Sequence, residues 1–240
     1  MTRTTQRTSA PVITRVVDLS HELYDEMPTY PGARRVETEV IHTHERDGYQ
    51  ITALSLTTHH GTHVDAPIHF VTGRRTTLSE IPTADLVGEA VVLRVPCGPD
   101  EAIDAALLDR SLVEHGEGLP ERPIFLLNTG FHDRHGDDAE LYGRHHPYVT
   151  EDGAAWLVGH NARVVGLDSS GFERHGAPIP EGSVAHNTLL GAGVVLIEEL
   201  VRLDQVDWPR PLVVVAPLPV RNADGAPARV LALELELAQT

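Results

Sequence analysis

The chain has 240 residues and carries 35 acidic against 19 basic side chains, which gives a formal net charge of −16. This charge disfavours binding to nucleic acid or to an anionic membrane surface, and no apolar run approaches the roughly 20 residues of a transmembrane helix. The absence of lysine excludes enzymes that need a lysine amine, such as Schiff-base and P-loop enzymes, and the single cysteine, Cys97, excludes an internal disulfide.

Short runs of aliphatic and β-branched residues predict strands along the whole chain. In chain order they are Val12–Asp18, Val36–His42, Gln50–Thr57, Ala90–Val95, Ile124–Leu127, Val164–Leu167, Val194–Ile197, Leu212–Ala216 and Val230–Leu237. Helical spacing before Gly116 predicts a helix over Ile103–His115, and a threonine cap predicts another over Thr150–Val158.

Strands outnumber helices, and several are continuous apolar runs typical of strands buried on both faces. We therefore predict an α/β fold, a single domain with a mixed β-sheet. The polar residues 1–12 are expected to form a flexible N-terminal arm and residues 13–240 the domain, with Gly130–Pro147 as a long polar connection. The start of the sequence has no apolar segment like that of a secretory signal, so we expect a cytoplasmic protein.

The segment His59–Phe70, HHGTHVDAPIHF, has the highest density of chemically active side chains. His59, His63, Asp65 and His69 are separated by even offsets, which place side chains on one face of an extended chain. Ten extended residues span roughly 33 Å, too far for one site, so the chain has to bend.

Gly61 and Pro67 stand where such bends would bring the outer histidines back towards the centre. His60 and Phe70 have the opposite parity, and we interpret them as packing residues. Imidazole and carboxylate ligands suit a divalent metal such as zinc or manganese, and three protein ligands leave open positions typical of a catalytic site. The alternative is a cluster of histidines without a metal.

This segment resembles the HxGTHxDxPxH motif of the cyclase family of metal-dependent hydrolases, which includes bacterial kynurenine formamidase and isatin hydrolase. Three further segments are similar to motifs of that family. They are Asp18-Leu19-Ser20 followed by residues 27–32 (MPTYPG), residues 165–170 (VGLDSS), and residues 186–190 (HNTLL) followed by Glu198.

The resemblance implies a role for each matched residue and the swivelling β/α/β fold of the family. It implies that His59, His63 and Asp65 hold one metal, that Asp65 and Glu198 bridge to a second metal, and that His186 completes that second site. His69 matches the general acid/base, and Tyr30 stands where formamidases carry a tryptophan against the substrate ring. Two divalent ions per chain, Zn²⁺ or Mn²⁺, and a homodimer are expected on the same basis.

The implied activity is hydrolysis of an amide, lactam or related cyclic C–N or C–O bond next to an aromatic or cyclic group, in the manner of an aryl-formamidase. A metal-activated hydroxide would be the nucleophile, with His69 as general acid/base. The alternatives are an isatin-like lactam hydrolase, a biosynthetic cyclase or dehydratase that uses the same metal site, and a member that only binds a small-molecule ligand.

Overall fold

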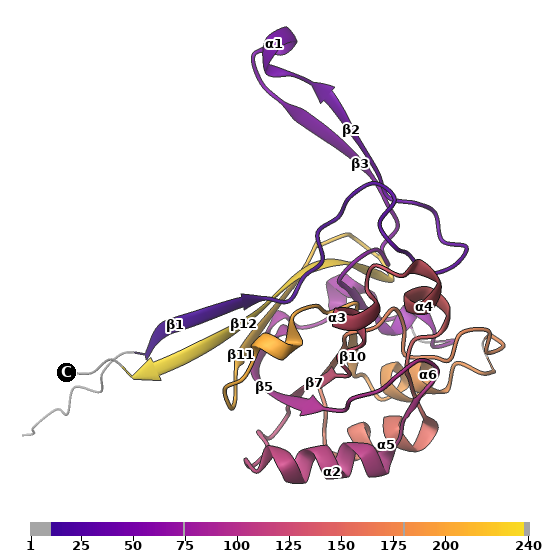
Figure 1. Cartoon of the computed structure of the whole chain (residues 1–240), viewed down its shortest axis with the longest axis vertical. Helices are drawn as coiled ribbons and strands as arrows, with labels where there is room; N and C mark the ends of the chain where they lie inside the picture. Colours follow the sequence, from indigo (N-terminus) through magenta and orange to yellow (C-terminus); the bar gives the residue numbers. More distant parts are fainter. Residues whose placement is uncertain (1–10, 74, 180, 238–240) are drawn as a thin grey trace, which may run out of the picture.

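A mixed sheet of eight strands forms the centre of the molecule (Figure 1). The computed structural model describes residues 11–73, 75–179 and 181–237. The strand order is β1-β12-β11-β5-β7-β9-β10-β4, and because β12 also pairs with β4, every strand except β1 belongs to a closed, barrel-like ring. The strands are β1 (Pro11–Asp18), β4 (His63–Asp65), β5 (Val87–Arg94), β7 (Ile124–Asn128), β9 (Val164–Leu167), β10 (Val195–Glu198), β11 (Leu212–Pro217) and β12 (Gly225–Leu237).

Strands β5, β7, β9 and β10 run parallel, and the remaining pairs of this sheet are antiparallel. All residues of β7, β9 and β10 are buried. Alternate side chains enter two cores: Leu126 and Ile197 face the inside of the ring, whereas Phe125 and Leu196 pack beneath the helices. Burial on both faces explains the continuous apolar runs, and the predicted α/β class with a mixed sheet is confirmed.

Three helices cover the outer core: α2 (Ala105–His115), α5 (Glu151–Gly159) and α6 (Val184–Gly191). Helix α2 is capped by Asp104, whose side chain accepts a hydrogen bond from Leu107 N–H at 2.7 Å, and it ends at Gly116, where φ is 71°. The helix begins at Ala105 and not at the predicted Ile103, because Ile103 belongs to the short strand β6 (Ala102–Ile103), which pairs with β8 (Tyr148–Val149). Thr150 caps α5 as expected.

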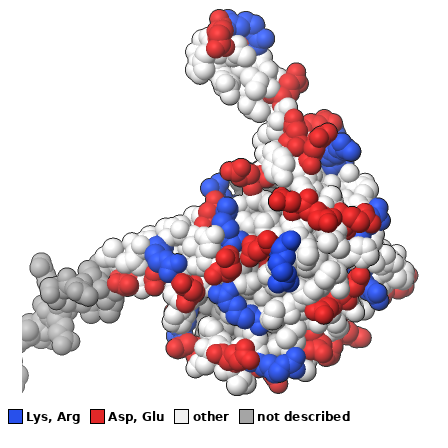
Figure 2. Space-filling model, viewed as in Figure 1, with Lys and Arg blue, Asp and Glu red and all other residues white. Residues whose placement is uncertain are grey.

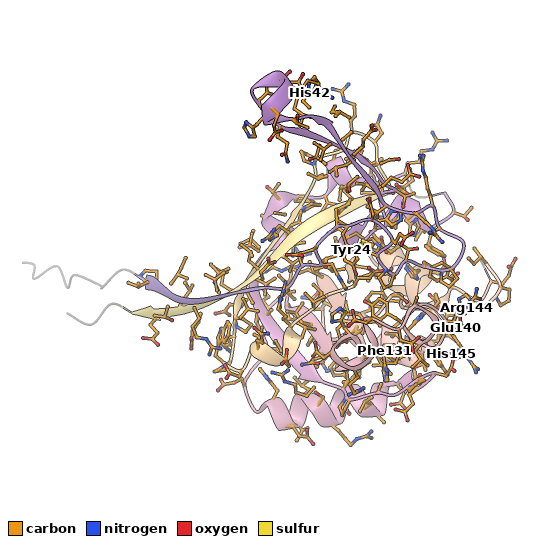
Figure 3. All side chains as sticks on the ribbon, turned by 45° about the horizontal axis from the view of Figure 1, so that its top comes forward. Tyr24, His42, Phe131, Glu140, Arg144 and His145 are labelled. Carbon is orange, nitrogen blue, oxygen red and sulfur yellow. The ribbon has the colours of Figure 1, made fainter. Side chains whose placement is uncertain are left out.

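The predicted polar connection Gly130–Pro147 folds into two short helices, α3 (Phe131–His135) and α4 (Ala139–Arg144). Glu140 and Arg144 form an ion pair of 3.2 Å along α4, and both lie close to His145 in Figure 3. Apart from α1, which lies in the hairpin described next, the remaining described helices are single 3₁₀ turns: η1 (Pro67–His69), η2 (Leu78–Glu80), η3 (Thr83–Leu86) and η4 (Leu203–Gln205).

A separate hairpin projects from the body of the molecule (Figure 1). Strands β2 (Glu37–His42) and β3 (Ile51–Ser55) pair only with each other, and the short helix α1 (His44–Asp47) joins them at the tip. His42 lies at this distal end in Figure 3.

The N-terminal boundary differs slightly from the expectation. Residues 11 and 12 begin strand β1, and the other residues assigned to the N-terminal arm lie outside the described residues.

Acidic and arginine side chains alternate over the face shown in Figure 2. None of the described helices has the length and apolar character needed to cross a membrane.

Candidate metal centre

The short strand β4 carries His63 and Asp65 into the centre of the sheet. It pairs with β10 on one side and with β12 on the other, so that Asp65 lies opposite both Leu196 and Gly225. The β10 register also places Glu198 opposite His63. Main-chain pairing on both sides therefore fixes two residues of the candidate centre and brings a third beside them.

The chain bends on both sides of β4, at the two positions that the sequence predicts. Gly61 has a φ of 59°, and a Cβ there would lie 2.8 Å from Leu23 Cδ2. Pro67 starts the turn η1, which carries His69 back over the strand. As a result, the rings of His59 and His69 stack with their centroids 3.9 Å apart.

Helix α6 places His186 against the same two carboxylates. His186 Nε2 lies 3.5 Å from Asp65 Oδ2 and 3.3 Å from Glu198 Oε1. His63 Nε2 lies 3.4 Å from Asp65 Oδ1 and 3.4 Å from Glu198 Oε2. His59 Nδ1 lies 2.8 Å from Asp65 Oδ1. The structure thus brings together all five residues that the resemblance implies as metal ligands, and adds His69 beside them.

In His59, His63 and His186, the ring nitrogen that faces away from the carboxylates is hydrogen-bonded to a group outside the cluster. These hydrogen bonds run from His59 Nε2 to Asp224 Oδ2 (3.0 Å), from His63 Nδ1 to the Gly61 carbonyl (2.8 Å) and from His186 Nδ1 to Glu173 Oε1 (3.1 Å). Such outer hydrogen bonds fix the tautomer and the orientation of a metal-binding imidazole. Each ring is therefore set so that its free nitrogen points into the cluster.

Several polar atoms in the cluster are buried and receive no hydrogen bond from any described group. They are His59 Nδ1, His63 Nε2, Asp65 Oδ1 and Asp65 Oδ2. His59 Nδ1 is close to Asp65 Oδ1, but the pair lacks hydrogen-bond geometry. Unpaired buried nitrogen and carboxylate oxygen atoms that converge on one point are the donors that a divalent cation takes. The residues present therefore fit such a cation.

The cluster also holds opposite charges at close range. Burial opposes ionisation of His63 and His186, but the carboxylates of Asp65 and Glu198 outweigh it and raise both pKa values well above the usual one. Burial likewise opposes ionisation of Glu198, yet the two histidines lower its pKa to about 2. A cation that binds here replaces protons on the histidines, because imidazole ligates metals in its neutral form.

His69 differs from the other histidines of the cluster. Burial lowers its pKa, and the neighbouring charges of His59 and His186 lower it further against the pull of Asp65. The ring is therefore neutral at pH 7 and able to accept a proton. This state suits the acid/base role that the resemblance implies for His69.

Apart from the deeply buried Asp65, the residues of the cluster line the floor of a cavity of about 260 Å³. Its walls are mostly apolar, with Tyr30, Phe70 and Ile179 among the lining residues and Arg174 beside them. Tyr30 is 42% exposed and its ring centroid lies 5.6 Å from that of His175. A cavity of this size and character, with polar groups gathered at one end, suits a small molecule.

Phe70 packs against the outer core, as interpreted from the sequence, but it also has a second role at the site. Its ring stacks on His186 at 4.2 Å and lines the cavity. The parity argument does not predict this contact, because the extended strand ends at Asp65 and a 3₁₀ turn follows. The same argument holds for His60, which is buried away from the cluster and accepts a hydrogen bond from Thr57 N–H at 2.8 Å.

Sequence reasoning missed three more polar residues of this region: Asp224, Glu173 and Glu199. The first two accept hydrogen bonds from His59 and His186, as described above. Glu199 lines the cavity and is buried with Oε2 unpaired among the described residues, and burial raises its pKa to about 8. Asp224 and Glu173 lie in turns whose composition gives no indication of a role, and only the fold brings them to the site.

Cys97 is no alternative nucleophile. It is buried and does not line the cavity. Burial and, next, the Glu101 carboxylate raise the pKa of its thiol to about 12, so the reactive thiolate is not formed at neutral pH.

Comparison with known proteins places this geometry in a family. The curated kynurenine formamidase of Bacillus mycoides is 28% identical over 225 residues, which cover 90% of this chain and 95% of that protein. The curated kynurenine formamidase of Bacillus cereus is 29% identical with the same coverage.

Solved structures agree with the sequence matches. Isatin hydrolase A from Labrenzia aggregata, bound to benzyl benzoate, superposes with a TM-score of 0.80 at 27% identity, covering 92% of this chain and 94% of that one. A potential metal-dependent hydrolase with cyclase activity superposes with a TM-score of 0.73 at 31% identity, covering 95% and 100% of the two chains. The sequence model of the family described as "Putative cyclase" matches residues 17–174, more than half of the chain. The protein belongs to the cyclase family.

Proposed function

We propose that the protein is a metal-dependent hydrolase that cleaves an amide or lactam C–N bond, or a related cyclic C–O bond, next to an aromatic or cyclic group. The observation that carries this proposal is the convergence of unpaired histidine and carboxylate atoms at the floor of an apolar cavity. Hydrolysis needs an activated water at one end of a site and a pocket for the substrate body at the other. The cavity offers candidate cation ligands for the first requirement and apolar walls for the second.

In this proposal His59, His63, Asp65, His186 and Glu198 hold divalent cations, Zn²⁺ or Mn²⁺. A bound cation supplies acidification of water and polarisation of a carbonyl group. The neutral imidazole of His69 takes a proton from the attacking water and returns it to the departing nitrogen or oxygen. Water is thereby added across the scissile bond, which leaves a carboxylic acid and an amine or alcohol.

Two cations per chain are proposed because each carboxylate faces two groups of histidines. Asp65 directs Oδ1 towards His59 and His63, and Oδ2 towards His186. Glu198 directs Oε2 towards His63 and Oε1 towards His186. A carboxylate with its oxygens turned in two directions is suited to bridge a pair of cations, whose repulsion its negative charge reduces.

An aryl-formamide is the first substrate class proposed, since the curated relatives are kynurenine formamidases. Tyr30 and Phe70 offer ring faces for the aromatic part of such a substrate. Ring opening of an isatin-like lactam is the second candidate, favoured by the structural likeness to isatin hydrolase A. Both reactions use the same addition of water to a carbonyl carbon.

A homodimer is proposed as the working form. The projecting hairpin exposes Val40, Ile41, Tyr49, Ile51 and Leu54, and a two-stranded hairpin is barely stable alone in water. A second copy of the chain would cover these side chains. Sedimentation or light scattering should give a mass near twice 26.2 kDa, and a monomer mass would contradict the proposal. The cytoplasmic location stays a prediction.

The function is tested with chelator-stripped protein that is reloaded separately with zinc and with manganese. Hydrolysis of N-formylkynurenine or isatin that disappears with stripping and returns with metal is the expected result. The products identify which bond the cavity presents to water. If neither compound is hydrolysed although metal is bound at full occupancy, the proposed substrate classes are contradicted and a biosynthetic cyclase or dehydratase is favoured.

A further inference from the structure

Asp224 lies immediately before β12, at the point where that strand meets the end of β4. Its carbonyl oxygen accepts a hydrogen bond from Ala66 N–H at 2.8 Å, which ties the turn to the metal-binding segment. The next residue, Gly225, is paired with Asp65. The position of Asp224 beside the cluster is therefore set by the main chain, although its side chain is 43% exposed.

The two carboxylate oxygens of Asp224 have different partners. Oδ1 accepts a hydrogen bond from Thr58 Oγ1 at 3.0 Å, which fixes the rotation of the carboxylate. Oδ2 accepts from His59 Nε2 at 3.0 Å and also lies 3.6 Å from His69 Nδ1. One oxygen atom is thus shared between two stacked rings, one of them a proposed ligand and the other the proposed acid/base.

We infer that Asp224 is a positioning residue that orients His59 towards the metal and His69 towards the substrate. The inference rests on the proposed function. By holding Nε2 of His59, the carboxylate leaves Nδ1 of that ring as the metal-binding atom. By drawing Nδ1–H of His69 towards itself, it leaves Nε2 of that ring to exchange the proton with the substrate. One side chain therefore couples the metal-binding geometry to proton transfer.

The two functions of Asp224 can be separated by two substitutions. Asp224→Ala removes both contacts, whereas Asp224→Asn retains an amide oxygen that can accept from His59 but carries no charge to attract His69. Zinc affinity of the stripped protein, measured by competition with a chromophoric chelator, should fall about 10- to 100-fold in the alanine variant. The asparagine variant should recover most of that affinity.

Turnover at saturating metal gives the second readout. With N-formylkynurenine or isatin as substrate, whichever the wild-type protein hydrolyses, kcat should fall about 10- to 100-fold in both variants while KM changes little. Asp133→Ala is a matched control, because Asp133 also contacts a histidine, His132 Nδ1 at 3.6 Å, but on helix α3, outside the residues that line the cavity. This variant should keep wild-type zinc affinity and kcat.

The outcomes distinguish this inference from the proposed function. If a folded Asp224→Ala protein binds zinc with wild-type affinity, the inference that Asp224 positions His59 is overturned, whereas the proposed function is not affected. Loss of a whole equivalent of bound zinc at saturation would make Asp224 a ligand and would also overturn the inference. Failure of the wild-type protein to bind zinc would overturn the proposed function and, with it, the role of Asp224.

Discussion

Gly225 allows the sharpest test of the site geometry, because it lies against both a main-chain oxygen and a proposed ligand. A Cβ at this position would lie 2.5 Å from the Val64 carbonyl oxygen and 2.8 Å from His59 Cε1. Ordinary contacts begin near 3.4 Å, so a Gly225→Ala substitution forces the His59 ring or strand β4 to move by roughly half an ångström or more. We predict that this shift weakens both the fold and metal binding.

The expected size of each effect follows from the contacts. Overpacking of this kind costs about 1–3 kcal/mol, which lowers Tm by roughly 2–4 °C per kcal/mol for a chain of this length. Displacement of His59 should lower zinc affinity at least about tenfold, as disturbance of a ligand's support does. Calorimetry of the stripped protein measures the first effect, and chelator competition measures the second.

Gly153 provides the matched control. It lies on α5 outside the cavity, and a Cβ there would meet the Ile103 carbonyl oxygen as closely as one at residue 225 would meet Val64. Gly153→Ala should therefore lower Tm, by somewhat less because alanine favours the helix by up to about 1 kcal/mol, without any change in zinc affinity. Equal zinc affinity in the two variants, or no loss of affinity in Gly225→Ala, would refute the reasoning.

Three further predictions concern the charged cluster. His69→Ala should reduce turnover about 10²- to 10⁴-fold while the metal content measured by mass spectrometry is retained; unchanged turnover would remove His69 from the proposed role. Glu198→Ala should lose at least one metal per chain, since this carboxylate faces both His63 and His186, and full occupancy would contradict its assignment. In the metal-free protein, the raised pKa values of His63 and His186 add stability that is complete below pH 6.5 and is lost as pH rises towards their folded values. The buried carboxyl of Glu199, with a pKa of about 8, acts in the same direction. The Tm of the stripped protein should therefore decrease as the pH is raised from about 6.5 to 8.5. A steady rise of Tm over this range would show that the histidines are not protonated.

The regular elements and the central motif were predictable from sequence because both depend on local patterns. The apolar runs of β7 and β9 reflect burial on two faces, and Gly61 and Pro67 are residues whose backbone preferences favour bends. The pairing of these runs into a closed ring was not predictable, since it depends on strands far apart in the chain.

The outer parts of the site were not predictable for the same reason. Asp224 meets His59 across 165 positions, and nothing in the composition around either residue indicates the contact. The cavity contact of Phe70 was missed because strand parity was extended past Asp65 into a segment that is no longer a strand. Residue types gave the chemistry of the ligands, whereas long-range packing gave their supports.

The double pairing of β4 also has a consequence for how the protein is made. Its partners β10 and β12 begin at Val195 and Gly225, whereas β4 itself ends at Asp65. The ribosome therefore releases the first proposed ligands well before the strands that fix them, and folding during synthesis cannot close the site until Gly225 has emerged. Until then His59, His63 and Asp65 lack the strands that hold them in place, so the proposed metal would be acquired only after most of the chain has been synthesised.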